Sequence, residues 1–469
     1  MTRVHSLSGA DVLVVGAGVV GLTATWRLLS AGSSVTLIAG EARTSASAAS
    51  GAMLSIFSEM DEAQPDERVR IDVSERLAAD ALWRDWLPEL ERVAPILTTN
   101  GTWVVGTAVE RRLLERMRAA ALDNGRMAEL HSIDEVPVRP SGGSAYGLWL
   151  PDERAVDSAQ LLSALDTAVR AHPAALVLDE DVQSLSLRSA GPVVAELAGR
   201  TAQADAVVVA AGAATSTLLG DLAAELEVPR VLAARGSGLL VASTKSYPNT
   251  IRSPNRAFAC GIHAVPRRGG CLYIGATNRF TALDDSMTDG AALDELAVII
   301  HSAVNDIDDR LYSARLLSTQ TGYRPFTLDR LPLVGRTADE RVLLATATYR
   351  SGVVLAARIA ELITTEILGS CPNPHPYSPR RRMDLPPDTV TLNLAAQDLI
   401  RSLIEPGGWI PPGVESRIAA FLALAMPDIV LGQTDDDLVE RLRRQWAAAP
   451  VLEAVPALFR EVHRARARD

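Results

Sequence analysis

The sequence predicts an α/β fold in which a parallel sheet is combined with an antiparallel sheet and a C-terminal helical part. Three observations predict it. Residues 11–38 run from an apolar strand through a glycine-rich turn into a helix and a second apolar strand. Residues 181–212 add alternating valines and glycine turns, and then a third apolar strand. Residues 371–390 are rich in proline, and four amphipathic segments follow them.

Composition limits the class of protein. The chain has 469 residues, 48% of them hydrophobic and 22% charged, which is enough for two or three domains with a sizeable core. A formal net charge of −11, with the basic residues scattered along the chain, argues against nucleic acid as a partner. The three cysteines have no paired spacing, so we expect neither a metal site nor a disulfide framework. Because we find no signal peptide pattern and no apolar run of about 20 residues, we expect a cytoplasmic protein without a membrane span.

The first glycine-rich turn has the spacing of a dinucleotide-binding site. It reads VVGAGVVG over residues 14–21, with Gly16, Gly18 and Gly21 between strand and helix. The first glycine permits the tight turn, the second lets the backbone approach a pyrophosphate, and the third lets helix and strand pack closely. The helix N-terminus would face the phosphates. The alternative is a Rossmann-like turn that binds nothing.

The acid that usually follows the second strand of this motif is missing. Ala39 stands where a carboxylate would bind the ribose hydroxyls, and Glu41 lies two residues further on. Either Glu41 replaces the acid, or the contact is lost or made by backbone and water. Loss of this contact would weaken the binding of NAD, a diffusing substrate, more than the binding of a flavin that many other contacts hold.

A second constellation occupies residues 205–220. It reads DAVVVAAGAATSTLLG, an apolar strand that ends in a glycine and a Thr/Ser-rich helix start, and a predicted antiparallel meander over 181–204 precedes it. This order is expected of an FAD-binding domain rather than an NAD-binding one. The alternative is an ordinary α/β domain with an inserted hairpin. The predicted fold class is therefore a Rossmann-like FAD-binding domain with an interleaved antiparallel-sheet substrate domain and a C-terminal α-helical appendage.

Five stretches occur in an order found in a known family. Besides VVGAGVVG and VVVAAG, the chain contains TSASAASGAMLSIFSE at 44–59, HAVPRRGGCLYIGATNR at 263–279 and TGYRPFTLDRLPLVGRTADERVLLATATYRSGVVLA at 321–356. Over residues 10–370 the chain resembles the D-amino-acid-oxidase superfamily of FAD-dependent oxidoreductases, and its glycine oxidase branch most closely. That branch has ATGHYRNG where this chain has ATATYRSG, a difference that weakens the case for free glycine as substrate.

The resemblance implies a reaction. Such enzymes pass a hydride from the substrate Cα to flavin N5, the resulting imine is hydrolysed, and oxygen reoxidises the flavin and becomes hydrogen peroxide. It implies non-covalent FAD, because no cysteine stands where related enzymes tether it, and a small or N-substituted, glycine-like α-amino acid. The extra tail and the altered pocket favour a specialised biosynthetic pathway. The alternatives are a dehydrogenase with an acceptor other than oxygen, and a flavin-binding scaffold whose tail docks a partner protein.

The resemblance also assigns catalytic residues. Arg324 falls on the family's carboxylate-binding arginine; the alternative is a surface ion pair with Asp329. Arg350 would lie close to the flavin ring, or else cap the surface, and Tyr349 is either catalytic or a core residue. His263 replaces a tyrosine that binds the substrate carboxylate, and as a cation it would suit an acidic ligand. The alternative for His263 is a core histidine bonded to the backbone.

The same resemblance places the cofactor. Ser47 would contact phosphate or ribitol, Met53 would line the flavin face or else pack in the core, and Gly352 would let a helix start approach the flavin O2 edge. Ser58 and Glu59 would cap the following helix. The predicted cofactor-binding residues are Gly16, Gly18, Val19, Val20, Gly21, Glu41, Ser47, Ser50, Gly51, Met53, Val182, Ala211, Gly212, Arg324, Ser351, Gly352, Val353 and Val354.

The order of the segments gives the domain organisation. We expect the FAD-binding domain to comprise residues 1–60, 150–225 and 325–370, the substrate domain residues 61–149 and 226–324, the linker residues 371–390 and the helical extension residues 391–469. The active site would lie between the two domains. We expect the extension to act as a buttress or a homo-oligomer contact, with docking of a partner protein as the alternative.

Overall fold

The computed structural model describes residues 11–40, 45–60, 66–187, 191–255, 261–281, 290–327, 329–369 and 375–381. Its helices are α1 (Val19–Ser30), α2 (Asp66–Glu91), α3 (Arg111–Asp123), α4 (Ser158–Arg170), α5 (Thr215–Leu219), α6 (Leu222–Glu225), α7 (Leu293–Ser302) and α8 (Gly352–Ile367). Its strands are β1 (Asp11–Val15), β2 (Ser34–Ile38), β3 (Met53–Leu54), β4 (Thr98–Thr107), β5 (Glu129–Ser132), β6 (Ser144–Val156), β7 (Ala175–Leu178), β8 (Ser184–Ser186), β9 (Val193–Glu196), β10 (Thr201–Ala204), β11 (Ala206–Val209), β12 (Leu232–Ala242), β13 (Thr250–Arg252), β14 (His263–Pro266), β15 (Cys271–Gly275), β16 (Arg279–Thr281), β17 (Arg315–Phe326), β18 (Leu333–Arg336) and β19 (Val342–Thr346).

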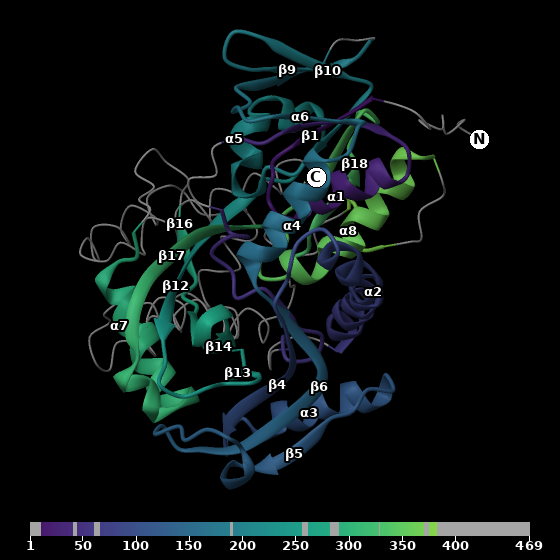
Figure 1. Cartoon of the computed structure of the whole chain (residues 1–469). Helices are drawn as coiled ribbons and strands as arrows, with labels where there is room; N and C mark the ends of the chain where they lie inside the picture. The colour runs from purple at the N-terminus through teal and green to yellow at the C-terminus, as the bar shows by residue number, and fades with distance from the viewer. Residues whose placement is uncertain are drawn as a thin grey trace, which may run out of the picture.

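A six-stranded sheet carries the N-terminal strand at its centre. Its order is β18-β19-β11-β1-β2-β7, and every neighbouring pair is parallel except β18 with β19. The predicted strand, helix and second strand over residues 11–38 are confirmed as β1, α1 and β2, and the predicted returning strand is confirmed as β11. In Figure 1 this sheet and its helices form the upper part of the molecule.

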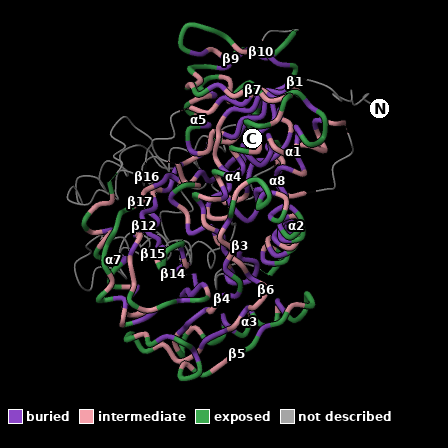
Figure 2. Tube along the Cα trace, in the orientation of Figure 1, coloured by how far each residue is buried: buried purple, intermediate pink, exposed green. Residues whose placement is uncertain are grey.

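The side chains of successive residues in β1 lie on opposite faces of this sheet. Val12 and Val14 pack in a core with side chains of α1, α2, α4 and α8. Leu13 and Val15 pack in a second core, toward the predicted meander, which is confirmed as the antiparallel sheet β10-β9-β8. Figure 2 shows the resulting layer of buried residues around α1, α8 and β1, with exposed turns beyond β9 and β10.

A ten-stranded sheet forms the second half of the described structure. Its order is β16-β12-β15-β14-β13-β4-β6-β3, and two further strands pair onto it, β17 with β12 and β5 with β6. Every recorded pair in it is antiparallel except β13 with β4, so the sheet is mixed rather than purely antiparallel as predicted. The domain boundaries stay predictions. Helix α2, from a stretch predicted to belong to the substrate domain, packs against α8.

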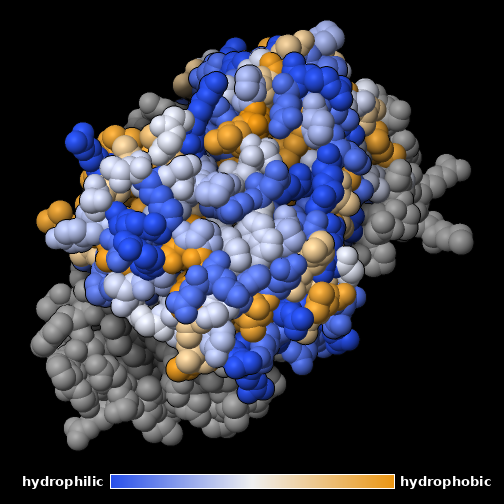
Figure 3. All heavy atoms as spheres, turned by 60° about the horizontal axis from the view of Figure 1, so that its bottom comes forward, coloured by the Kyte–Doolittle hydropathy of each residue, from blue (hydrophilic) through white to orange (hydrophobic). Residues whose placement is uncertain are grey.

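The described part of the linker stays attached to the first sheet. The carbonyl of Tyr377 accepts a 2.8 Å hydrogen bond from the backbone N–H of Val334 in β18, and Tyr377 is buried. The predicted helical extension, residues 391–469, lies outside the described residues, so its role stays a prediction. In the part of the chain that the structure describes, no helix is long and apolar enough to cross a membrane. Figure 3 shows apolar residues scattered among hydrophilic ones on the face that it presents.

Candidate active site

The turn after β1 requires glycine at two of its predicted positions. Gly16 has φ +111°, and a Cβ there would lie 2.4 Å from the Ala210 carbonyl oxygen; a Cβ on Gly21 would lie 1.9 Å from the Gly16 oxygen. Helix α1 has Gly18 at its N-cap without a side-chain cap, and the N–H of Val19 donates to Ser47 Oγ at 3.1 Å. The backbone thus forms a close turn that leads into a helix N-terminus, the arrangement that binds phosphate groups.

Of the other residues predicted for this end of the cofactor, Ala211 and Gly212 lie beside the same turn. The N–H of Ala210 donates to the Val15 carbonyl at 2.9 Å, which places the turn that contains Ala211 and Gly212 beside the end of β1. Val182 lies half-buried against the core beneath the β8–β10 sheet. Glu41 lies outside the described residues, so whether it replaces the missing acid stays untested.

A cavity lies between strands of the ten-stranded sheet and the start of α8. Five residues that were predicted to bind the cofactor line it from two places. Ser50, Gly51 and Met53 come from the segment after residue 45, and Val353 and Val354 come from the start of α8. The lining residues are Ala46, Ala49, Ser50, Gly51, Ala52, Met53, Glu59, Arg76, Gly236, Arg252, His263, Tyr273, Gly322, Arg324, Arg350, Val353 and Val354. The structure therefore brings the predicted Arg324, Arg350 and His263 together.

Arg324 extends from β17 into this cavity. Its Nη1 atom donates to the Thr277 carbonyl at 2.9 Å and to Asn278 Oδ1 at 3.3 Å. A Cβ at Gly236, on the paired strand β12, would lie 1.9 Å from Nη1, so glycine there makes room for the guanidinium. The alternative of a pair with Asp329 is wrong, because Asp329 binds Arg381 at 2.7 Å.

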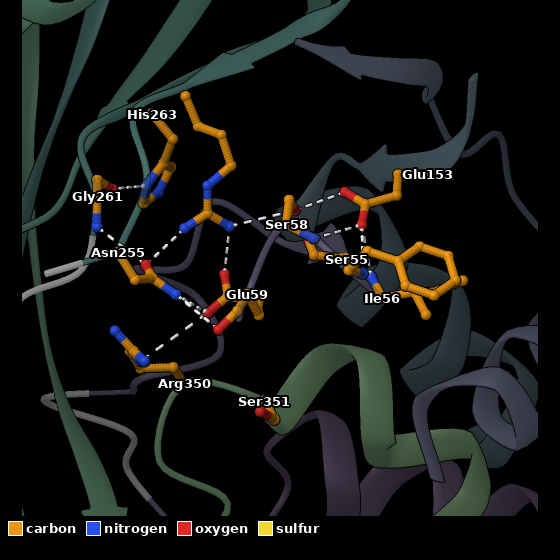
Figure 4. A network of polar contacts seen from close by, with 12 residues as sticks. Ser55, Ile56, Ser58, Glu59, Glu153, Asn255, Gly261, His263, Arg350 and Ser351 are labelled. Atoms are coloured by element: carbon orange, nitrogen blue, oxygen red, sulfur yellow. Dashed lines mark hydrogen bonds and ion pairs between the residues drawn. The ribbon is translucent and has the colours of Figure 1, made fainter. Parts of the chain in front are cut away.

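Glu59 enters the cavity from the segment after β3, and Figure 4 shows its partners. Its Oε1 atom accepts from Arg252 Nη1 at 2.5 Å, its Oε2 atom accepts from Asn255 Nδ2 at 3.1 Å, and Arg350 Nε lies 3.9 Å from Oε2. Burial disfavours the ionised carboxylate, but Arg252, Arg350 and Arg76 outweigh it and hold the Glu59 pKa well below its usual range. The prediction that Glu59 caps the next helix is wrong, because its oxygens are committed to these partners.

Glu153, which the sequence did not single out, holds the segment that carries Glu59. Its Oε1 atom accepts from the backbone N–H groups of Ile56, Phe57 and Ser58 at 2.9, 2.7 and 2.8 Å. Its Oε2 atom accepts from Ser58 Oγ at 2.5 Å, so Ser58 is not a helix cap either. With only 1% of its surface exposed, Glu153 acts as a buried anchor on β6 for three consecutive backbone donors (Figure 4).

His263 is both a cavity residue and a buried histidine bonded to backbone. Its Nδ1 atom lies 3.0 Å from the Gly261 carbonyl oxygen, and because a carbonyl only accepts, Nδ1 carries the proton. The ring stacks on Tyr273 at 5.7 Å, and Nε2 faces the Gly51 backbone. Burial lowers the pKa of His263 to about 3, and Arg252 and Arg324 add to this effect. The prediction of a cationic His263 is therefore wrong, because the neutral form is held at physiological pH.

The start of α8 closes the cavity. Tyr349 is buried with φ +49°, and its hydroxyl accepts from Asn278 Nδ2 at 2.6 Å. The side chain of Arg350 lies over the Tyr349 ring at 5.3 Å and is 12% exposed, so it is not a surface cap. Arg76, from α2, donates to Ser351 Oγ at 2.5 Å and to the Ser55 carbonyl at 2.9 Å, and so ties α8 to the segment after β3.

A model of the FAD dependent oxidoreductase family, DAO, matches residues 11–366. The chain belongs to this family. Glycine oxidase from Pseudomonas putida is 28% identical over 391 residues, which cover 80% of this chain and 99% of that protein. Glycine oxidase from Geobacillus kaustophilus is 26% identical over 354 residues, covering 74% of this chain and 89% of that protein.

Solved structures show the same fold. The crystal structure of glycine oxidase from Geobacillus kaustophilus matches with a TM-score of 0.69 at 23% identity, over 80% of this chain and 99% of that chain. The crystal structure of iminodiacetate oxidase from Chelativorans matches with a TM-score of 0.66 at 18% identity, over 78% of this chain and 98% of that chain. At these identities the likeness concerns the fold alone.

The residues present fit FAD, the cofactor of the family. The turn at Gly16 leaves no space for a side chain, and α1 begins at Gly18, which carries no side chain of its own that could cap the helix. The start of α8 brings a second helix N-terminus to the cavity, next to Val353 and Val354. Met53, on β3, lines the cavity wall. Non-covalent attachment stays a prediction, and among the described residues no cluster of His, Cys, Asp and Glu could hold a metal ion.

Proposed function

We propose that this protein oxidises the C–N bond of a small or N-substituted, glycine-like α-amino acid, with O2 as the final oxidant and H2O2 as a product. The observation that carries the proposal is Arg324: among the described residues only its Nη1 atom has partners, and these are neutral oxygens. Its remaining donors are available for a carboxylate in the cavity. The two glycine oxidases described above support the proposal at the level of the reaction.

The oxidation removes a hydride from the substrate Cα and a proton from its nitrogen. Water then adds to the imine, which breaks into a 2-oxo acid and an amine. Bound FAD supplies the two-electron acceptor. The chain's own residues position the substrate: Arg324 binds the α-carboxylate, and neutral His263 presents the lone pair of Nε2, which suits an N–H donor of the substrate rather than its carboxylate.

The start of α8 would hold the flavin end of FAD. Ser351 and Gly352 lie at the N-terminus of that helix, where partial positive charge stabilises an anion. Arg76 fixes Ser351, and Trp83 Nε1 donates to the carbonyls of Val353 and Val354 at 3.1 and 3.0 Å. These contacts keep the cavity wall rigid, and rigid positioning is what the protein must contribute to cofactor chemistry.

A pathway-specific role in biosynthesis is part of the proposal. The Pseudomonas putida glycine oxidase is matched over 99% of its length by 80% of this chain, so about a fifth of this chain has no counterpart in it. An appendage of this size supports a specialised setting rather than general glycine breakdown.

Aerobic turnover of the FAD-loaded protein tests the proposal. Glycine, sarcosine, D-amino acids and N-carboxymethyl amines are supplied in turn, and H2O2 and 2-oxo acid are measured together. Equal yields of the two products support the oxidase. Oxidation without peroxide that requires a quinone or dye would make the protein a dehydrogenase, whereas a colourless protein that takes up no FAD would make it a scaffold.

A further inference from the structure

A buried acid on α7 lies behind the strand that pairs with β17, from which Arg324 extends. Glu295 has none of its surface exposed, and α7 packs against β12, the partner of β17 (Figure 1). A carboxylate withdrawn from water is costly unless it is both paired and hydrogen-bonded. Glu295 meets both conditions, because Arg235 Nη2 lies 3.3 Å from its Oε2 atom and donors from three segments of the chain bond its oxygens.

The donors to Glu295 belong to elements that are far apart in the sequence. The backbone N–H of Ala292, at the start of α7, donates to Oε2 at 2.8 Å, and Ser237 Oγ, on β12, donates to the same oxygen at 3.1 Å. Thr277 Oγ1, in the loop after β15, donates to Oε1 at 3.3 Å. The carboxylate therefore joins α7, β12 and the loop after β15 at one point.

Thr277 connects this carboxylate to Arg324. The Thr277 carbonyl accepts from Arg324 Nη1 at 2.9 Å, so a shift of the Thr277 backbone would move the guanidinium. Two bonds tie Thr277 to β12: its N–H donates to the Ser237 carbonyl at 3.1 Å, and its Oγ1 atom accepts from the Ser237 N–H at 2.9 Å. The bond from its hydroxyl to Glu295 is a third attachment. Ser237 and Glu295 together thus set the position of the Thr277 carbonyl.

The charge of Glu295 also sets the direction of the hydroxyl bonds around it. Because a carboxylate only accepts hydrogen bonds, Ser237 Oγ gives its one proton to Glu295. In the 3.1 Å bond between Ser237 Oγ and Thr321 Oγ1, Thr321 is then the donor. Thr321 pairs with Ser237 across the two strands and stands three residues before Arg324 on β17. Glu295 therefore reaches Arg324 through its own strand as well as through Thr277.

We propose that Glu295 is a positioning residue for substrate binding, which holds Arg324 in the orientation that binds the substrate carboxylate. The inference rests on the proposed function, because it takes Arg324 as the carboxylate-binding group. A planar guanidinium binds a carboxylate through two parallel hydrogen bonds only when the two groups are aligned. A small displacement therefore weakens binding although the charge remains. Glu295 is not among the residues that line the cavity, so the clamp is aligned from outside it.

Binding of acetate measures the clamp without turnover. Acetate has a carboxylate and no amine, and its dissociation constant from the FAD-loaded protein is followed through the flavin absorbance. We expect Glu295→Gln to raise this constant by about threefold to tenfold, because an amide leaves either Thr277 or Ser237 without its acceptor. Glu295→Ala should raise it at least as much. An unchanged acetate constant in both variants would overturn the proposal.

Asp308→Asn is the matched control. Asp308 is as fully buried as Glu295, but its partners Arg310 and Lys245 belong to residues 309–313 and to the loop after β12. Both variants should lower the free energy of unfolding in urea, whereas only Glu295→Gln should change the acetate constant. An equal change in Asp308→Asn would show a general loss of structure and overturn the positioning role. If the Glu295 variants do not fold, Thr277→Val removes the hydroxyl that bonds Glu295 and should weaken acetate binding in the same way.

A combined variant shows whether Glu295 acts through Arg324. If it does, Arg324→Ala with Glu295→Gln should have the same kcat/KM for the best amino-acid substrate as Arg324→Ala alone. Losses that multiply would mean that Glu295 acts independently of Arg324, and they would overturn the proposal.

The acetate assay separates this inference from the proposed function. A protein that oxidises no amino acid would refute the proposed function, whereas an acetate constant that depends on Glu295 would still support the inference. A wild-type protein that binds no acetate would overturn the inference, even if it oxidises amino acids.

Discussion

Replacing Arg324 by alanine removes the group that we expect to hold the substrate. The guanidinium is oriented by two hydrogen bonds from Nη1 and by the space that Gly236 leaves. A hydrogen bond to a charged group contributes about 1.5 to 3 kcal/mol, so a clamp of two such bonds contributes about 3 to 6 kcal/mol before water replaces part of it. We expect a net loss of about 3 kcal/mol in transition-state binding, which is roughly a 100-fold fall in kcat/KM.

The assay is steady-state turnover with the best amino-acid substrate, at matched flavin content. The ratio of flavin to protein should stay at the wild-type value in Arg324→Ala, because Arg324 is argued to bind the substrate. Arg139→Ala serves as the control, since it deletes an exposed arginine that pairs with Asp309 at 3.4 Å on the surface. A wild-type kcat/KM in Arg324→Ala would refute the assignment of the carboxylate to this residue.

Three further predictions concern stability, cofactor retention and pH. Glu153→Gln should lower the free energy of unfolding, measured in urea, by about 1 to 3 kcal/mol, because a neutral amide accepts hydrogen bonds from three backbone N–H groups less strongly than a carboxylate does. An unchanged free energy of unfolding would show that this anchor does not stabilise the fold. Gly16→Ala should yield protein with little bound FAD, since the new Cβ would lie 2.4 Å from the Ala210 oxygen; a wild-type flavin content speaks against the phosphate turn. Because the pKa of His263 is about 3 in the folded protein and the ordinary pKa of histidine is 6.5, the unfolded chain binds more protons between these values, and wild-type stability should fall as pH decreases through this window. The slope from this residue is at most about 1.4 kcal/mol per pH unit, and unfolding curves of His263→Asn that parallel the wild type across the window would contradict it.

The sequence predicted the elements whose signal is local. The strand, glycine turn, helix and second strand over residues 11–38 lie within one short stretch, and Gly16 and Gly21 have a steric reason that the pattern alone conveys. The meander and the returning strand β11 were recognisable for the same reason, because alternating and continuous apolar runs differ in period. The parallel pairing of β13 with β4 was not predictable, because the sequence of neither strand indicates which strand it pairs with.

The buried polar network of the candidate site depends on contacts between distant residues. Glu153 lies 97 positions from Ile56, and Arg252 lies 193 positions from Glu59. From the sequence alone, an acid such as Glu59 after a short strand is interpreted as a helix cap as readily as a member of a buried network. Glu153 stands between Asp152 and Arg154 in β6, so its immediate neighbours in the sequence do not mark it as a buried anchor.

His263 shows why a residue type alone does not give a charge state. The sequence left two alternatives for His263, a cation and a core histidine bonded to the backbone, because its protonation depends on burial and on Arg252 and Arg324, which come from other strands.

Anaerobic reduction of the bound flavin by an amino acid tests the central claim most directly. The purified, FAD-loaded protein is mixed without oxygen with an amino acid or, separately, with NADH, and the visible absorbance of the oxidised flavin is followed. We expect complete bleaching by an amino acid, at least as fast as turnover, and recovery of the absorbance when O2 is admitted. A flavin that NADH bleaches and that no amino acid reduces would contradict it.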